Sequence, residues 1–238
     1  MTRGARGRRQ PAARGDREPE ARSFRPMPED RSGPRGEPMQ RSYDTSLEGP
    51  ASRRRRRIPA TLDPGRTLLV SCFDAALPLE RMGLSARGVS CAQVRSPAHL
   101  VAPWSDKVAS ENAPLLLSLS MRETHDVVIC GHVQCAALEV LLDEERDRGA
   151  FGLMAQVPAA RATMDLVRHN YGGLDRESLR EVMAQENVLT QLDHLLTYPP
   201  LSRGDGPRVH AWLYDERDAS LWGYSFEESQ FAHQISLR

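Results

Sequence analysis

Residues 127–135 read VVICGHVQC, and this stretch carries the strongest signal in the sequence for both fold and chemistry. Its continuous run of valine and isoleucine is typical of a strand buried on both faces, as in a parallel sheet. The run ends at Gly131, and His132 and Cys135 follow, three positions apart. An imidazole and a thiol at this place are candidate metal ligands, but a single His-x-x-Cys is a weak signal because cysteine is often a small buried apolar residue. A metal site here therefore needs further ligands from elsewhere in the chain.

Strand-like and helix-like segments alternate on both sides of this stretch. Short apolar runs predict strands at 67–71, 88–95, 126–130 and 209–214, with a hairpin partner at 220–224. Helical patterns lie between them, at 106–123, 134–147, 152–170 and 175–197. Pro114 is expected to start or kink the first helix, and Asp175 to cap the last. This alternation predicts an α/β fold with a mostly parallel β-sheet flanked by helices.

A second predicted strand also ends on a metal-ligand residue type. Cys72 follows the run at 67–71, and Phe73 and Asp74 come next. Ligands of open α/β sheets collect outside the carboxyl ends of the strands, so Cys72, His132 and Cys135 should converge if the two strands are neighbours. Two thiolates and one imidazole suit zinc, and three protein ligands leave a fourth position for water, as in catalytic zinc sites. Asp74 could reach that fourth position or the water on it.

Residues 1–57 differ in composition from the rest of the chain. They hold 16 arginines against 8 acidic residues, whereas residues 58–238 hold 16 basic and 24 acidic residues. With few large apolar side chains, the first segment is predicted to be a disordered tail before one folded domain at 58–238. The arginine run at 53–57 could contact nucleic acid, but no aromatic residues are interleaved with it, so a solvated tail is expected.

The sequence shows neither an apolar run long enough to span a membrane nor a signal-peptide pattern. We therefore expect a cytoplasmic protein with no membrane association. In that compartment the four cysteines are expected to be thiols or metal ligands and not disulfides.

Five segments form a pattern that covers nearly all of the expected domain. They are LLVSCFDAALPLE at 68–80, VRSPAHLVAP at 94–103, CGHVQCAALEVLL at 130–142, ENVLTQLDHLL at 186–196 and VHAWLYDERDASL at 209–221. In order and approximate spacing they resemble the signatures of the β-class carbonic anhydrases, which read C-x-D-S-R, V-R-N-A-G-N, C-G-H-S-x-C-G-A, E-N-V-x-x-Q-L and W-x-Y-D. The resemblance covers residues 66 to about 226 and implies that family's zinc-binding α/β fold.

The resemblance also implies roles for single residues. It places zinc on Cys72, His132 and Cys135, and it makes Asp74 the active-site carboxylate. The implied reaction is the reversible hydration of carbon dioxide to bicarbonate, with Asp74 orienting the attacking hydroxide. A homodimer or higher homo-oligomer is implied as well. Cys130 matches a position that is not a ligand in the family, and Cys91 matches no motif, so both are expected to be packed in the core.

The sequence departs from the family pattern around the expected site. The family carboxylate pairs with an arginine two residues on, where this chain has Ala76. An unpaired Asp74 could bind zinc itself and displace water, unless Arg81 or Arg95 takes the place of the missing arginine. Val133 and Ala136 replace a serine and a glycine, and the family's N-A-G-N loop has become SPAH at 96–99. These changes alter the shape and hydrogen bonding expected near a small-substrate pocket.

Two hypotheses follow, and the missing arginine separates them. The first is a zinc-dependent carbonic anhydrase, and the second is a zinc-binding relative without that activity and with a binding or regulatory role. His99 could move protons near the site, but a surface position is expected for it. The same expectation holds for the other histidines outside the motif, His125, His169, His194, His210 and His233. Trp212 and Tyr214 are expected to pack within the sheet.

Overall fold

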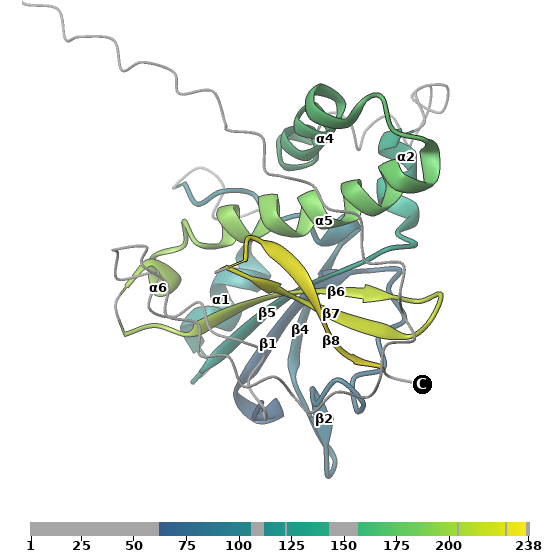
Figure 1. Ribbon diagram of the computed structural model, residues 1–238. Coiled ribbons are helices and arrows are strands. Elements are labelled where there is room, and N and C mark those ends of the chain that lie inside the picture. Colours follow the sequence, from purple (N-terminus) through teal and green to yellow (C-terminus); the bar gives the residue numbers. More distant parts are fainter. Residues whose placement is uncertain are drawn as a thin grey trace, which may run out of the picture.

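The computed structural model describes residues 62–105, 112–121, 123–142, 157–203, 205–226 and 228–236. The tail predicted at 1–57 lies outside these residues. The described part is built on a six-stranded sheet with the order β4-β1-β5-β6-β7-β8 (Figure 1). The strands are β1 Thr67–Cys72, β4 Ala92–Ser96, β5 Asp126–His132, β6 Arg208–Asp215, β7 Ser220–Ser225 and β8 Gln230–Ser236. The pairs β4–β1, β1–β5 and β5–β6 are parallel, and β7 and β8 add an antiparallel end.

Most of the predicted strands are confirmed, and one is not. The segment predicted as a single strand at 88–95 is divided at Cys91 into β3 Val89–Ser90 and β4. β3 pairs with β2 Ser85–Ala86 across a turn at Arg87 and Gly88, which have φ of 51° and 79°. Two consecutive residues with positive φ are what a tight two-residue hairpin turn requires. The turn therefore reverses the chain before β4 joins the sheet. The sequence analysis did not predict β8.

The helices lie between the strands as predicted. They are α1 Ala113–Met121, α2 Ala136–Leu142, α4 Pro158–Tyr171, α5 Arg176–Leu195 and the short α6 Pro199–Ser202, with 3-10 turns η2 Pro64–Arg66 and η3 Pro97–His99. Pro114 lies in the first turn of α1, and Asp175 caps α5 by accepting from the backbone N–H groups of Glu177 and Ser178. Parts of three predicted helices, at 106–111, 143–147 and 152–156, lie outside the described residues.

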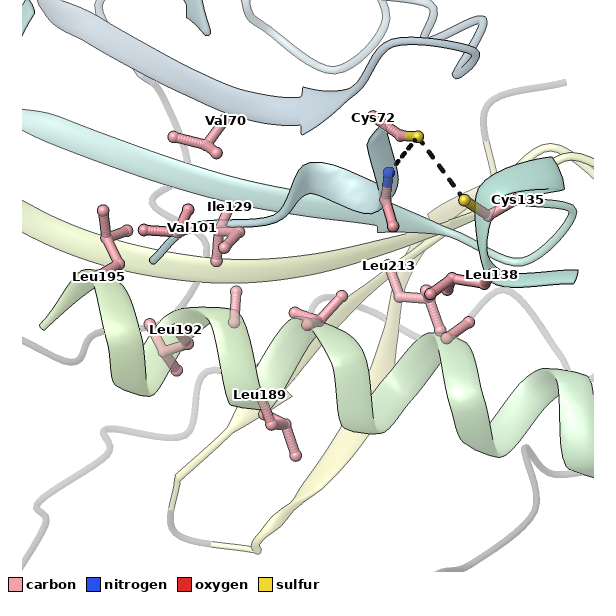
Figure 2. Close-up of a cluster of buried hydrophobic side chains, with 14 of the residues drawn as sticks. Val70, Cys72, Val101, Ile129, Cys135, Leu138, Leu189, Leu192, Leu195 and Leu213 are labelled. Atoms are coloured by element: carbon pink, nitrogen blue, oxygen red, sulfur yellow. Dashed lines mark hydrogen bonds between the residues drawn. The ribbon is translucent and has the colours of Figure 1, made fainter. Parts of the chain in front are cut away.

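One face of the sheet packs against helix α5, and Figure 1 shows α4 and α2 beyond it. Val70 and Ile129 of the sheet face Leu192 and Leu195 of α5 in a continuous apolar cluster (Figure 2). The cluster ends at Cys72 and Cys135, so the two thiols lie where the helix face of the sheet meets the strand ends.

The opposite face of the sheet packs against the segment that leads into β4. Trp212 and Tyr214 are buried there together with Met82, Leu84 and Cys91. The predicted packing roles of both aromatic residues and of Cys91 are therefore confirmed.

Candidate metal centre

Two parallel neighbours in the sheet bring the predicted ligands together. β1 and β5 pair in register, with Ser71 opposite Cys130, so Cys72 and His132 both lie at the carboxyl edge of the sheet. Cys135 lies in the turn between β5 and α2. One donor atom from each of Cys72, Asp74, His132 and Cys135 lies within 4.8 Å of the others. The structure thus groups all four residues that the sequence singled out.

Gly131 allows β5 to end this close to its neighbours. A Cβ at this position would lie 2.4 Å from Cγ2 of Val188 on α5 and 3.0 Å from Cε1 of His99. Real Cβ atoms do not approach that closely, so only glycine fits without a shift of the helix or of the histidine. The apolar strand therefore ends on a glycine because α5 and the 97–99 turn both pack against it.

The geometry of the two thiols fits a shared metal ion. The Sγ atoms of Cys72 and Cys135 are 3.6 Å apart (Figure 2). A disulfide needs about 2.05 Å, whereas two sulfurs on one tetrahedral zinc, each about 2.3 Å from the metal, lie about 3.8 Å apart. Without metal, the hydrogen bond with Cys135 lowers the pKa of Cys72 to about 6 against the effect of burial, and the same bond raises the pKa of Cys135. The two thiols thus share one proton, and a divalent metal ion would take the place of that proton.

His132 is held from both ring nitrogens. Its Nδ1 contacts a carboxylate oxygen of Glu216, whose other oxygen accepts from the backbone N–H of Gln134 at 3.2 Å. Its Nε2 lies 3.0 Å from Oδ1 of Asp74. Burial would lower the pKa of His132, but its contacts with Cys72 and Glu216 outweigh burial and raise it to about 10. A carboxylate on the outer nitrogen fixes the ring so that the inner nitrogen can bind a metal.

The sequence analysis did not identify Glu216. In the register of β5 with β6, His132 lies opposite Tyr214, and Glu216 comes two residues after Tyr214. Cys72 was found because ligand residues collect at the carboxyl ends of parallel strands. The same reasoning, applied to the strand predicted at 209–214, would have found Glu216.

Asp74 faces the other donors and has no arginine partner among the described residues. Its Oδ2 accepts from the backbone N–H of Ala136 at 2.9 Å, and its Oδ1 contacts His132. Burial opposes its ionisation, but the Cys72 side chain and the charge of His132 outweigh burial, so the pKa of Asp74 lies below its usual value. Ala76, at the position of the missing arginine, is exposed.

Arg95, one of the two arginines that the sequence left open as a substitute, does not replace that arginine. Its guanidinium donates to the backbone carbonyls of Cys72 at 3.1 Å and of Phe73 at 3.2 Å, and also to the carbonyl of Ala75. Those contacts hold the loop after β1 by its backbone and leave the Asp74 carboxylate to other partners.

Two histidines expected at the surface are buried. His99 has no exposed surface, and burial lowers its pKa to about 3. His210 is 2% exposed, and its Nε2 lies 2.7 Å from Oδ1 of Asp126. The expectation failed because both rings have tertiary partners that are distant in sequence. His125, His169 and His233 are exposed, and His194 is half-buried.

Comparison with known proteins assigns the family. A sequence profile described as "Carbonic anhydrase" matches residues 67–221. The chain belongs to the β-class carbonic anhydrase family. The carbonic anhydrase of Synechocystis sp. is 30% identical over 164 residues, which are 67% of this chain and 59% of that protein. The carbonic anhydrase of Synechococcus elongatus is 29% identical over 63% of this chain and 56% of its own length. The chain therefore spans less than two thirds of these relatives.

Solved structures of the family share the fold. The β-carbonic anhydrase CcaA superposes with a TM-score of 0.63 at 29% identity, over 73% of this chain and 79% of that one. A Coccomyxa β-carbonic anhydrase in complex with acetazolamide gives a TM-score of 0.55 at 20% identity, over 67% and 71% of the two chains. The mostly parallel sheet flanked by helices is thus the family fold. None of the helices in the described part of the chain is both long and apolar enough to span a membrane.

Proposed function

We propose that this chain is a zinc-dependent carbonic anhydrase, which interconverts carbon dioxide and bicarbonate. The observation that supports this most directly is the grouping of Cys72, Asp74, His132 and Cys135 within 4.8 Å. Cys72, His132 and Cys135 would hold the ion, because two thiolates and one imidazole match the preferences of zinc. When bound, zinc would act as a Lewis acid and lower the pKa of water to about 7.

The residues around these donors have separate tasks in the proposal. Glu216 holds the His132 ring in one orientation through Nδ1. The Ala136 N–H fixes one oxygen of Asp74 and leaves Oδ1 facing the other donors. Oδ1 would accept a hydrogen bond from the oxygen that attacks carbon dioxide. That oxygen bonds to the carbon, its proton passes to solvent, and bicarbonate is the product.

A second candidate, a zinc-binding homologue with little turnover, rests on the surroundings of Asp74. The carboxylate lies within the donor group, and its contacts among the described residues are with His132 and Ala136. In that position it competes with water for the fourth place on the metal. We expect this competition to slow the reaction, because no arginine of the described segments holds the carboxylate away.

Further proposals concern assembly and location. Two β-carbonic anhydrases of Sordaria macrospora with a similar fold are tetrameric, at a TM-score of 0.54 and 18% identity. This likeness supports a homo-oligomer for the present chain, and a cytoplasmic location stays a prediction.

The proposal is tested by zinc analysis together with stopped-flow hydration of carbon dioxide by the full chain. Bound zinc with hydration above the rate of buffer supports the enzyme. Bound zinc without hydration supports the homologue with little turnover. Absence of bound zinc contradicts both.

A further inference from the structure

We infer that Asn187 is a positioning residue of the metal centre. It holds the turn at 97–99 so that the backbone N–H of Ala98 donates to Sγ of Cys72. The inference rests on the proposed zinc site. Asn187 lies on helix α5, 89 positions after Ala98, and within the described residues its side chain hydrogen-bonds to Ala98, His99, Thr163 and Gln191, none of which is a donor of the site.

The turn that Asn187 holds has an unfavourable backbone conformation. Ala98 has φ 51° and ψ 27°, and His99 has φ 46°. Residues with a Cβ rarely adopt this left-handed region, and two in succession persist only where surrounding contacts impose them. The conformation brings the Ala98 N–H to 3.0 Å from Sγ of Cys72.

Asn187 supplies contacts that impose this conformation. Its Nδ2 donates to the carbonyl of Ala98 at 2.8 Å and lies 3.1 Å from Nε2 of His99. It thus contacts both left-handed residues of the turn. Asn187 and His99 have no exposed surface, so water does not compete for these hydrogen bonds.

The neighbours of Asn187 determine which way its amide points. The Val101 N–H can only donate, and it donates to Oε1 of Gln191 at 2.9 Å. The Nε2 of Gln191 must then be the donor, which contacts Oδ1 of Asn187 at 3.2 Å, and Thr163 donates to the same oxygen at 2.9 Å. The Nδ2 group is therefore left to face the turn. The network has one orientation, and that orientation places a donor against Ala98 and His99.

The expected consequence for the metal centre is electronic as well as geometric. An N–H group that donates to a thiolate withdraws electron density from the sulfur and fixes its direction. Groups that orient a ligand in this way typically change metal affinity by about tenfold to a hundredfold when they are removed. Asn187→Ala should therefore weaken metal binding although Asn187 is not itself a ligand.

The test uses the full chain, stripped of metal and titrated with Zn²⁺ and with Co²⁺. Asn187→Ala should lower zinc affinity about tenfold or more and shift the sulfur-to-cobalt charge-transfer absorption. Tyr171→Phe is the matched control, because it removes a hydrogen bond from α4 to Glu186 of α5 without touching Asn187 or the turn. It should leave affinity and spectrum unchanged. Ala98→Gly on the Asn187→Ala background should restore part of both, because glycine adopts positive φ without help.

Urea unfolding of each variant separates loss of fold from loss of positioning. Wild-type affinity and spectrum in Asn187→Ala would overturn the inference alone. Equal effects of Asn187→Ala and Tyr171→Phe, without recovery by Ala98→Gly, would also overturn it and leave Asn187 a packing residue. A wild-type chain that binds neither Zn²⁺ nor Co²⁺ would overturn the proposed function, and the inference with it.

Discussion

Oδ1 of Asp74 lies 3.0 Å from Nε2 of His132, although the two residues follow different strands of the sheet. The outer nitrogen of His132 is taken by Glu216, and the second oxygen of Asp74 is taken by the Ala136 N–H. Each residue therefore directs its remaining donor atom at the other and at the two thiols. We interpret Asp74 as part of the donor group, and this relationship is the basis of the predictions about the site.

The first prediction separates the four cysteines and His132 by role. Cys72→Ser, His132→Ala and Cys135→Ser should each lose zinc, because each removes one of three ligands. Cys91→Ser and Cys130→Ser should keep about one zinc per chain, because these two thiols are buried among apolar side chains. Metal analysis of the five purified variants checks this. Zinc retained in all three ligand variants would show that these residues do not form the metal site.

The second prediction concerns the missing arginine. If Asp74 closes the site, as in the second candidate, Ala76→Arg should draw it away from the metal through a charge-assisted hydrogen bond and raise carbon dioxide hydration at neutral pH. Ala76 is exposed, so a long side chain has room to leave the backbone. Ala76→Gln is the neutral control and should not raise the rate. Stopped-flow assays with a pH indicator measure the effect.

Asp74→Ala complements that test. It should admit an exchangeable water ligand yet lose the group that orients the attacking oxygen, so hydration should not recover. Two results would argue against the account of Asp74. One is a wild-type rate equal to that of ordinary family members, and the other is an Ala76→Arg protein whose zinc keeps an unchanged ligand set.

The third prediction concerns the glycine that ends β5. Gly131→Ala should destabilise the fold by about 1–3 kcal/mol through overpacking against Val188 and His99. Gly173→Ala should cost little, because nothing lies within 4 Å of the Cβ it would gain. Urea unfolding gives both values. Equal stability of the two variants would show that β5 and α5 are less tightly packed than the structure indicates.

The fourth prediction is a pH dependence of stability at the other end of β5. Burial opposes ionisation of Asp126, but hydrogen bonds from His210 and Arg208 outweigh burial and keep the pKa of Asp126 below its usual value. A depressed pKa means that the carboxylate stabilises the fold above its unfolded pKa of about 3.9, and that this contribution is lost as pH falls through the folded value.

Asp126→Asn should therefore destabilise the protein by about 3 kcal/mol at neutral pH, and the difference from wild type should shrink below about pH 4. Acid loss of metal affects both proteins and cancels in the difference. Glu123→Gln, which alters an exposed ion pair with Arg66, should change little. A difference for Asp126→Asn that stays constant from neutral to acid pH would contradict the assignment.

The parts of the fold that were predictable from sequence are those with a local signal. β1 and β5 are buried on both faces and read as continuous apolar runs, and α5 begins at an aspartate whose side chain caps it. The strand predicted at 88–95 was wrong in its extent. Its first residues belong to the hairpin of β2 and β3 around the turn at Arg87 and Gly88, and β4 begins only after that hairpin. β8 was missed because its sequence, QFAHQIS, does not alternate regularly between apolar and polar residues.

The residues of the candidate site also divide into those with a local signal in the sequence and those without one. Cys72, His132 and Cys135 could be predicted because thiols and an imidazole follow apolar runs, and parallel strands bring such ends together. Burial of His99 could not be predicted, because it depends on Asn187 and Gly131, which come from other elements. The position of Asp74 likewise depends on the Ala136 backbone and not on its own neighbours in sequence.

The account's central claim is that Cys72, His132 and Cys135 bind zinc, with the Asp74 carboxylate beside the fourth position. X-ray absorption at the zinc edge of the full wild-type chain tests it most directly. We predict about one zinc per chain, bound by two sulfurs and two lighter atoms, one of them the His132 nitrogen. A chain without zinc, or a zinc bound by fewer than two sulfurs, would contradict the claim.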